Sequence, residues 1–205
     1  MNAMTAPTIE ALPGWFGKLP GIGDFAHRRL PEAFRDTWDT WLQTNLLTLR
    51  ERHEDWVARY LEGPVWFFVL GEQVAGTGAW IGVLMPSVDG VGRYFPFTLA
   101  AELVLPPDAS RMQQWWALAS QAALIGLEQD LDATGFDALL ARLFEAPAPT
   151  DDTAALPPFP AAGQSHWCTD PADAGALQMT TAGLPRGPRF EALFGFADAA
   201  GMEVA

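Results

Sequence analysis

Cysteine is almost absent from this sequence, because Cys168 is the only one among its 205 residues. One thiol can form neither an internal disulfide nor a cysteine-rich zinc site, since both need two or more cysteines. The three histidines, His27, His53 and His166, form no H-E-x-x-H pair of the kind that holds zinc on a helix. We therefore expect no metal site, and the cysteine usage fits a reducing compartment.

Positive charge is also scarce. Lys and Arg number 12 against 25 Asp and Glu, which gives a formal net charge of −13. So acidic a surface repels nucleic acid and anionic membranes, and we expect neither as a partner. No run of about 20 apolar residues is present, and the first residues lack the basic and apolar regions of a signal peptide. The sequence therefore predicts a cytoplasmic protein without a membrane span.

Apolar residues follow two different periods along the chain. Alternation and short apolar runs predict strands at 14–19, 65–70, 79–85, 93–104, 165–169 and 176–180. Spacings of three and four predict helices at 31–62, 108–127 and 135–144, and residues 188–194 are expected to form a turn or a short helix. The segment 31–62 is expected to form two helices, with a break near Asn45 or His53. Together these elements predict an α/β (α+β) sandwich, in which helices pack on a central, mostly antiparallel sheet.

The length suits one domain, which we expect at residues 14–195 between flexible arms at 1–13 and 196–205. The stretch 146–163 contains five prolines and is expected to form an irregular, mobile loop. Pro96 interrupts the strand expected at 93–104. Because proline lacks the N–H that a ladder needs, this strand is expected at an edge of the sheet or with a bulge.

Two glycine-rich stretches of similar character organise the chain, at Gly14–Leu30 and Ile81–Leu99. Each runs from a strand into a Gly/Pro turn that carries an aspartate, followed by arginine and aromatic residues. Aspartate supplies two acceptor oxygens at turns that are rich in unpaired N–H groups. We therefore expect Asp24 and Asp89 to accept hydrogen bonds from backbone amides or from Arg28 or Arg93.

These turns allow a structural and a functional interpretation. In the first, their charged residues form salt bridges that order the two loops. In the second, the loops present a partner-binding surface on a rigid scaffold. The residues assigned to that surface are Gly23, Asp24, Phe25, Arg28, Arg29, Asp89, Arg93 and Tyr94.

Other candidate chemistry is weaker. Gly21-x-Gly23 could cradle a phosphate, but it lacks the third glycine of a dinucleotide fingerprint and the G-K-[ST] of a P-loop. His166 and Cys168 share a face of a strand but lie too far apart to act as a nucleophilic pair. Trp115 and its neighbour Trp116 cannot both face inward on one helix, so one is expected to cover a loop or contact a partner. We expect no catalytic residue and no cofactor.

The motifs in these stretches resemble the TagF family, which is associated with type VI secretion. The longest matches are G-W-F-G-K-L-P-G-I-G-D-F at the start of Gly14–Pro31 and G-V-L-M-P-S-V-D-G-V-G-R-Y-F-P at Gly82–Pro96. Shorter matches lie at Trp38–Gln43, Tyr60–Trp66, Ser165–Trp167 and Gly183–Pro185. The chain departs from the family pattern at Phe67, where arginine is common, and at Cys168, where an aromatic residue is usual. Both departures fall on strands outside the turns.

The resemblance implies a cytoplasmic, non-enzymatic regulator that represses type VI secretion after translation. It implies a partner that is a forkhead-associated scaffold protein or another component of the apparatus, and a mixed α/β sandwich similar to longin-type domains. The residues alone leave a second hypothesis open. In that hypothesis the protein is a small enzyme, or a domain that binds a phosphate or nucleotide ligand with its Asp/Arg glycine-rich turns.

Overall fold

The structure is a computed structural model, and it describes residues 12–105, 108–145, 159–173 and 175–196. Most of the two predicted arms and of the predicted loop 146–163 lies outside these ranges. Seven strands form one sheet in the order β2-β1-β5-β4-β3-β6-β7, and each pairing is antiparallel. The strands are β1 (Gly14–Gly17), β2 (Ala26–Arg28), β3 (Trp66–Leu70), β4 (Ala79–Met85), β5 (Phe97–Leu103), β6 (Gln164–Cys168) and β7 (Gln178–Ala182).

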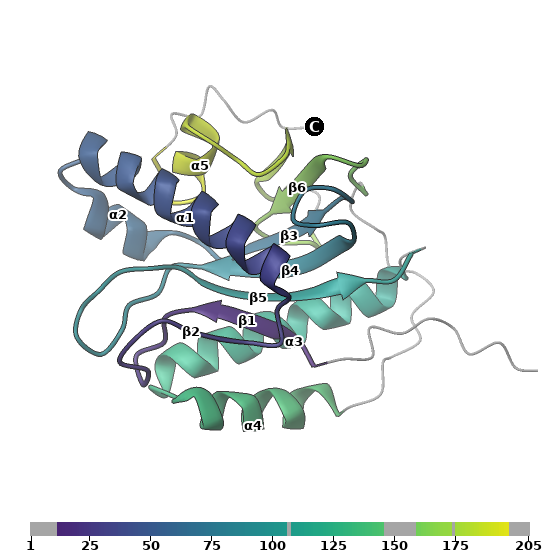
Figure 1. The fold of residues 1–205 in the computed structure, drawn as a ribbon, viewed down its shortest axis with the longest axis horizontal. Coiled ribbons are helices and arrows are strands. Elements are labelled where there is room, and N and C mark those ends of the chain that lie inside the picture. Colours follow the sequence, from purple (N-terminus) through teal and green to yellow (C-terminus); the bar gives the residue numbers. More distant parts are fainter. Residues whose placement is uncertain (1–11, 106–107, 146–158, 174, 197–205) are drawn as a thin grey trace, which may run out of the picture.

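Five helices cover the two faces of this sheet. Helices α1 (Glu32–Arg52), α2 (Trp56–Glu62) and α5 (Pro188–Ala192) pack on one face, and α3 (Ala109–Glu128) and α4 (Ala133–Phe144) on the other (Figure 1). The predicted α/β (α+β) sandwich around an antiparallel sheet is therefore confirmed. The likeness to longin-type domains stays a prediction.

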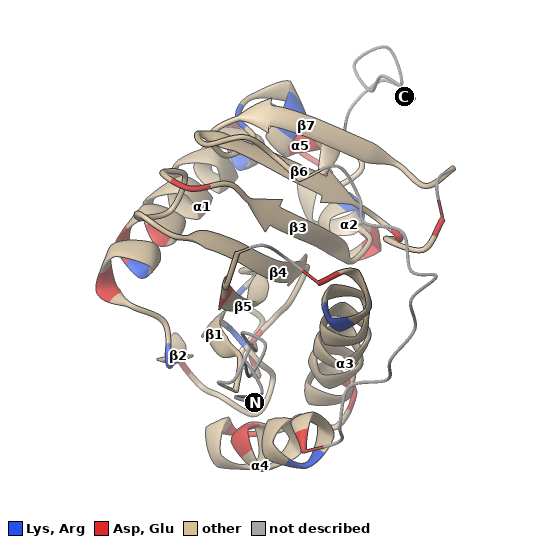
Figure 2. Cartoon of the chain, turned by 90° about the vertical axis from the view of Figure 1, so that its right-hand side faces the viewer, with Lys and Arg blue, Asp and Glu red and all other residues tan. Residues whose placement is uncertain are grey.

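The neighbouring strands β3 and β4 are apolar because both of their faces are covered. β3 and β4 carry no charged residue, and in Figure 2 they are tan throughout, whereas the helices around them carry blue and red segments. Such strands read as continuous apolar runs because neither face meets water. On the α1 side, the buried ring of Trp38 lies 5.0 Å from Phe68 and 6.1 Å from Trp167. Its Nε1 donates to the buried Thr98 hydroxyl at 2.9 Å, so this polar atom of the core is paired.

The predicted break in 31–62 falls at His53, the second of the two expected positions. His53 adopts an extended backbone (φ −130°, ψ 111°), which ends α1 and lets α2 start at Trp56. Of the two alternatives for 93–104, the edge position is wrong and the bulge stays a prediction. β5 lies between β1 and β4, in the interior of the sheet. The strand begins at Phe97, one residue after Pro96, so the missing N–H of the proline interrupts no ladder bond.

The expectation that Trp115 and Trp116 cannot both face inward is also wrong, because both side chains are buried. Trp116 donates its Nε1 proton to the Gly82 carbonyl of the sheet at 3.0 Å. The Trp115 ring lies 6.2 Å from the Phe144 ring of α4. Since α3 is covered by the sheet on one side and by α4 on another, its buried face is wide enough for two adjacent tryptophans.

Candidate functional site

The two glycine-rich turns meet at one end of the sheet. β1 and β5 are antiparallel neighbours, with Phe16 opposite Thr98, so the end of β1 lies beside the start of β5. β1 ends at Gly17, which has a φ of +126°. A Cβ at Gly17 would lie 2.2 Å from the Pro96 carbonyl oxygen. This glycine therefore allows the first turn to approach the backbone of the second.

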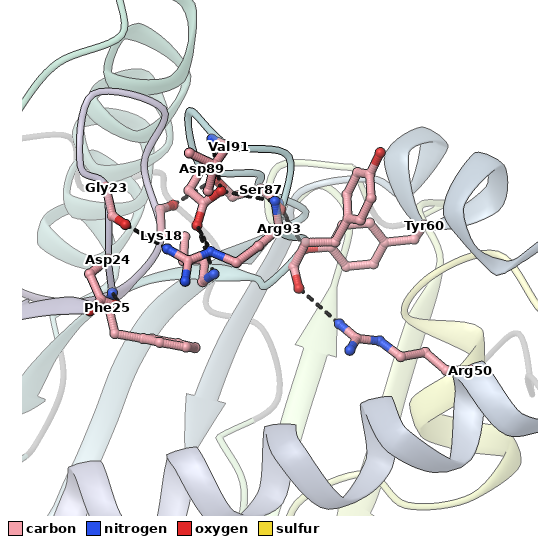
Figure 3. Close-up of polar contacts among 11 residues, drawn as sticks. Lys18, Gly23, Asp24, Phe25, Arg50, Tyr60, Ser87, Asp89, Val91 and Arg93 are labelled. Carbon is pink, nitrogen blue, oxygen red and sulfur yellow. Dashed lines mark hydrogen bonds and ion pairs between the residues drawn. The ribbon is translucent and has the colours of Figure 1, made fainter.

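Asp89 is the polar centre of this junction (Figure 3). Its side chain is fully buried, and Oδ2 accepts bonds from Lys18 Nζ at 2.8 Å and Arg93 Nε at 2.7 Å. Oδ1 accepts bonds from the amides of Val91 at 3.1 Å and Arg93 at 2.9 Å. Burial by itself would raise the pKa of Asp89, but these donors outweigh it and hold the pKa well below its usual value. The predicted hydrogen bonds of Asp89 are confirmed, and Lys18 is a partner that sequence reasoning missed.

Further bonds join the second turn to its surroundings. Arg93 Nη2 donates to the Gly23 carbonyl at 2.5 Å, and the Ser87 hydroxyl donates to the Lys18 carbonyl at 2.6 Å. The buried Tyr60 hydroxyl of α2 donates to the Ser87 carbonyl at 3.0 Å and accepts from the Ser87 amide at 2.9 Å. Burial raises the pKa of Tyr60, so it stays protonated and keeps this donor. The two turns and α2 thus form one hydrogen-bonded unit.

The first turn uses its charged residues differently. The Asp24 carboxylate is exposed and accepts the amide proton of Phe25 at 2.7 Å, as the prediction of a backbone donor requires. Arg28 and Arg29 point to the other side of the sheet, toward Asp137 of α4. Arg29 Nη2 lies 2.7 Å from Asp137 Oδ1, and Arg28 Nε lies 3.8 Å from Oδ2. The structure therefore separates these two arginines from the other residues assigned to the partner surface.

A cavity of about 620 Å³ lies beside the joined turns, between them and helices α1 and α2. The lining residues are Lys18, Phe25, Gln43, Leu46, Leu47, Arg50, Trp56, Arg93, Tyr94 and Phe95. Of the predicted site residues, Phe25, Arg93 and Tyr94 line this cavity, whereas Gly23 and Asp89 hold Arg93 in place behind it.

Sequence reasoning missed the wall that α1 and α2 contribute to the cavity. Gln43, Leu46, Leu47 and Arg50 recur at spacings of three and four, so they share one stripe of α1. Leu47 is 58% exposed. In the sequence, the one signal for this part of the wall was an apolar residue that lies beside the core-facing stripe of the helix. Lys18, the only lysine, stands inside the first motif and could have been assigned from that position.

The pair His166 and Cys168 forms no nucleophilic site. His166 Nδ1 lies 2.9 Å from the Thr180 hydroxyl oxygen, and no contact joins the imidazole to the thiol among the hydrogen bonds of the described residues. Burial, and to a lesser degree the Asp170 carboxylate, raises the pKa of Cys168 to about 12. A buried thiol with a raised pKa is inert because the thiolate is the reactive form.

Cys168 should therefore react slowly with thiol reagents while the protein is folded. We expect alkylation by iodoacetamide at pH 8 to be about a hundredfold or more slower in buffer than in 6 M guanidinium chloride. Intact-mass spectrometry over time measures both rates, and the unfolded chain serves as the control for intrinsic reactivity. Equal rates in the two conditions would show that the thiol is accessible in the folded state.

The described ranges contain neither a metal-binding cluster nor a membrane-spanning helix. No three His, Cys, Asp or Glu side chains in them lie close enough together to hold a metal ion. None of the helices within these ranges is both long and apolar enough to cross a membrane.

Comparison with known proteins identifies the family. Residues 14–143, more than half of the chain, match the family described as the TagF N-terminal domain, type VI secretion system-associated. The fold is similar to the crystal structure of PA0076 from Pseudomonas aeruginosa PAO1 at 2.05 Å, with 30% sequence identity and a TM-score of 0.72. That match covers 89% of this chain and 93% of PA0076. No curated protein sequence was found to match. The matched range contains both glycine-rich turns and the α1 wall of the cavity, and the chain belongs to the TagF family of type VI secretion-associated proteins.

Proposed function

We propose that this protein is a cytoplasmic, non-enzymatic regulator that represses type VI secretion after translation. In this proposal it binds a forkhead-associated scaffold protein, or another component of the apparatus, through a surface made by its two turns. We define this turn surface by Phe25, Val91, Arg93 and Tyr94. The observation that supports it most is that the two longest family motifs, far apart in the sequence, are hydrogen-bonded into one ordered surface beside a cavity.

The exposure of apolar side chains on the turn surface supports a binding role. Val91 is 71% exposed and Phe25 is 45% exposed. The Val91 amide is nevertheless bonded to Asp89, so the turn that carries this exposed side chain is held in place. Apolar and aromatic side chains on a pre-ordered loop lose little entropy on binding, and arginine and aromatic residues are enriched at interface centres.

The enzyme or phosphate-ligand alternative has less support. Both oxygens of Asp89 are occupied by two donors each, which leaves the carboxylate poorly placed to act as a base. Gly21 has a packing role, since a Cβ there would lie 2.1 Å from the Asp130 carbonyl oxygen. A glycine that the fold itself requires is no indication of a phosphate cradle. We therefore favour regulation by binding.

Deletion of the gene in its host tests the proposal. Secretion of type VI substrates into the medium should rise on deletion, and the wild-type gene should restore repression. Val91→Glu should fail to restore it, because a charge on an exposed interface residue is desolvated on binding and lowers the affinity. Leu124→Glu is the matched control, since Leu124 is 42% exposed on α3, on the opposite face of the sheet. Immunoblots of cell extracts and medium measure the amount of each variant and the secretion.

Val91 is a better position for this test than Arg93, whose exchange for glutamate would set a second carboxylate beside the buried Asp89 and destabilise the fold. Unchanged or reduced secretion on deletion would contradict a repressor function. Full repression by Val91→Glu would place the partner surface elsewhere.

A further inference from the structure

The cavity beside the turns is positively charged in a strongly acidic protein. Three cations line it, Lys18, Arg50 and Arg93, and none of its lining residues among the described part of the chain is acidic. The buried Asp89 behind them offsets one of these charges, so the lining residues and Asp89 together carry a formal charge of about +2 at neutral pH. The carboxylate of Asp39 accepts a bond from the lining Gln43 at 2.7 Å. The chain as a whole carries −13. An anionic group approaching this protein is therefore repelled by most of the surface and attracted here.

Arg50 is the cation that is most available to a ligand. Lys18 and Arg93 are both bonded to Asp89, at 2.8 and 2.7 Å. Arg50 donates one bond to the Tyr94 carbonyl at 2.9 Å, and its guanidinium lies 4.5 Å from the centroid of the Trp56 ring. Within the described ranges no carboxylate lies within 4.0 Å of it. A guanidinium has five N–H donors in a planar fork, so Arg50 keeps donors for a carboxylate while Trp56 holds it in position.

The rest of the lining is apolar and continues to the protein surface. Leu46 and Phe95 are buried, whereas Phe25 and Leu47 are 45% and 58% exposed. Phe25 rests edge-on against Phe95, with ring centroids 4.4 Å apart, so its position is supported by the core. The apolar lining thus reaches outward on two sides, from the first turn and from α1. Phe25 also belongs to the turn surface, which makes the cavity continuous with it.

We propose that this cavity binds an acidic segment of a partner protein, with one carboxylate on Arg50 and a neighbouring aromatic or large aliphatic side chain against Phe25 and Leu47. The inference rests on the proposed function and names the chemistry of the partner. The charge of the cavity selects the carboxylate, and its apolar lining selects the adjacent side chain. A protein segment fits better than a small molecule because the exposed rim at Phe25 and Leu47 offers contact area outside the cavity.

A random dodecapeptide library selected on the purified full chain tests the ligand class. We expect the enriched sequences to place Asp or Glu within two positions of Phe, Trp or Leu. The best peptide is then compared with a twin in which Asn and Gln replace Asp and Glu, and the loss of charge should weaken binding about tenfold or more. Titrations followed by heteronuclear NMR measure both affinities and show whether the amide signals of the cavity shift.

Charge-matched variants of the protein locate the site. Arg50→Glu and Leu47→Glu should each weaken the peptide about tenfold or more, because one reverses the anchoring charge and the other places a carboxylate on the apolar rim. The controls are Arg142→Glu on α4 and Leu124→Glu on α3, which are exposed on the other side of the sheet and should change the affinity less than about twofold. The NMR spectrum of each free variant reports whether its fold is intact.

Enrichment of basic or neutral sequences, or acidic peptides that bind Arg50→Glu as tightly as wild type, would overturn the inference. A wild-type dimer that Leu47→Glu dissociates in sedimentation would also overturn it, because a second copy of the chain would then occupy the cavity. Failure of the peptide experiments alongside derepression by gene deletion and by Val91→Glu would leave the proposed function intact and reject only this ligand class.

Discussion

Replacing Asp89 by asparagine is expected to lower the melting temperature of the protein by about 10 °C, although the side chain keeps its shape. Lys18 is only 4% exposed although it lines the cavity, so its ammonium group would lose its carboxylate and gain little water in exchange. An uncompensated buried charge is among the most destabilising changes in a protein. The carboxamide would also present an N–H₂ group in place of one of the two oxygens that each accept two bonds. Thermal unfolding followed by circular dichroism at pH 7 measures the effect.

Asp24→Asn is the matched control, since it makes the same chemical change in the other turn. Its carboxylate is exposed and accepts one backbone N–H, so we expect a shift of less than about 2 °C. The double variant Lys18→Met/Asp89→Asn should be more stable than the sum of the two single changes predicts, because it removes both buried charges. Equal melting temperatures for Asp24→Asn and Asp89→Asn would show that the buried ion pair does not stabilise the fold.

The same aspartate predicts a dependence of stability on pH. Because its pKa is lower in the folded than in the unfolded state, Asp89 stabilises the protein fully above its unfolded pKa, near 4. This stabilisation is lost as the pH falls from about 4 toward the folded pKa. The difference in unfolding free energy between wild type and Asp89→Asn should therefore be constant from pH 5 to 7 and shrink below about pH 4. Urea unfolding at each pH measures it, and a constant difference down to pH 3 would contradict the lowered pKa.

Gly21→Ala is expected to lower the free energy of unfolding by about 2–3 kcal/mol. A Cβ at Gly21 would lie 2.1 Å from the Asp130 carbonyl oxygen and 2.7 Å from the Leu131 carbonyl oxygen, in the connection between α3 and α4. Both atoms belong to the backbone, so a rotamer change cannot remove the contact, and the first turn must separate from α3 and α4. Urea unfolding followed by tryptophan fluorescence measures the loss.

Gly23→Ala provides the control within the same motif. A Cβ at Gly23 would meet no atom within 4 Å, and we expect the free energy of unfolding to change by less than about 1 kcal/mol. Equal losses of stability at the two positions would mean that position 21 requires glycine for its backbone flexibility and not because of the close contact with Asp130.

The sequence by itself determined the local structure and the family. The apolar spacing of residues 32–52 predicted a helix that buries Trp38 and its neighbours, and the structure confirms it. The uncharged runs at Val65–Leu70 and Ala79–Met85 predicted strands, which are β3 and β4 in the interior of the sheet. These features are readable because a helix or strand imposes its own period on the residues that must leave water. The long motifs at the two turns were readable for another reason, namely that they are specific to the TagF family.

Only the tertiary structure decided how these parts meet. Lys18 and Asp89 are 71 positions apart, and they pair because β1 lies beside β5 in the sheet. Arg28 belongs to the same motif as Gly23 but faces Asp137, because β2 carries Arg28 away from the turn and toward α4. From the sequence, the α1 residues that line the cavity cannot be distinguished from an ordinary exposed helix surface, because only the fold places α2 and the turns beside them. Contacts of this kind depend on strand order and helix placement, and no local period in the sequence encodes them.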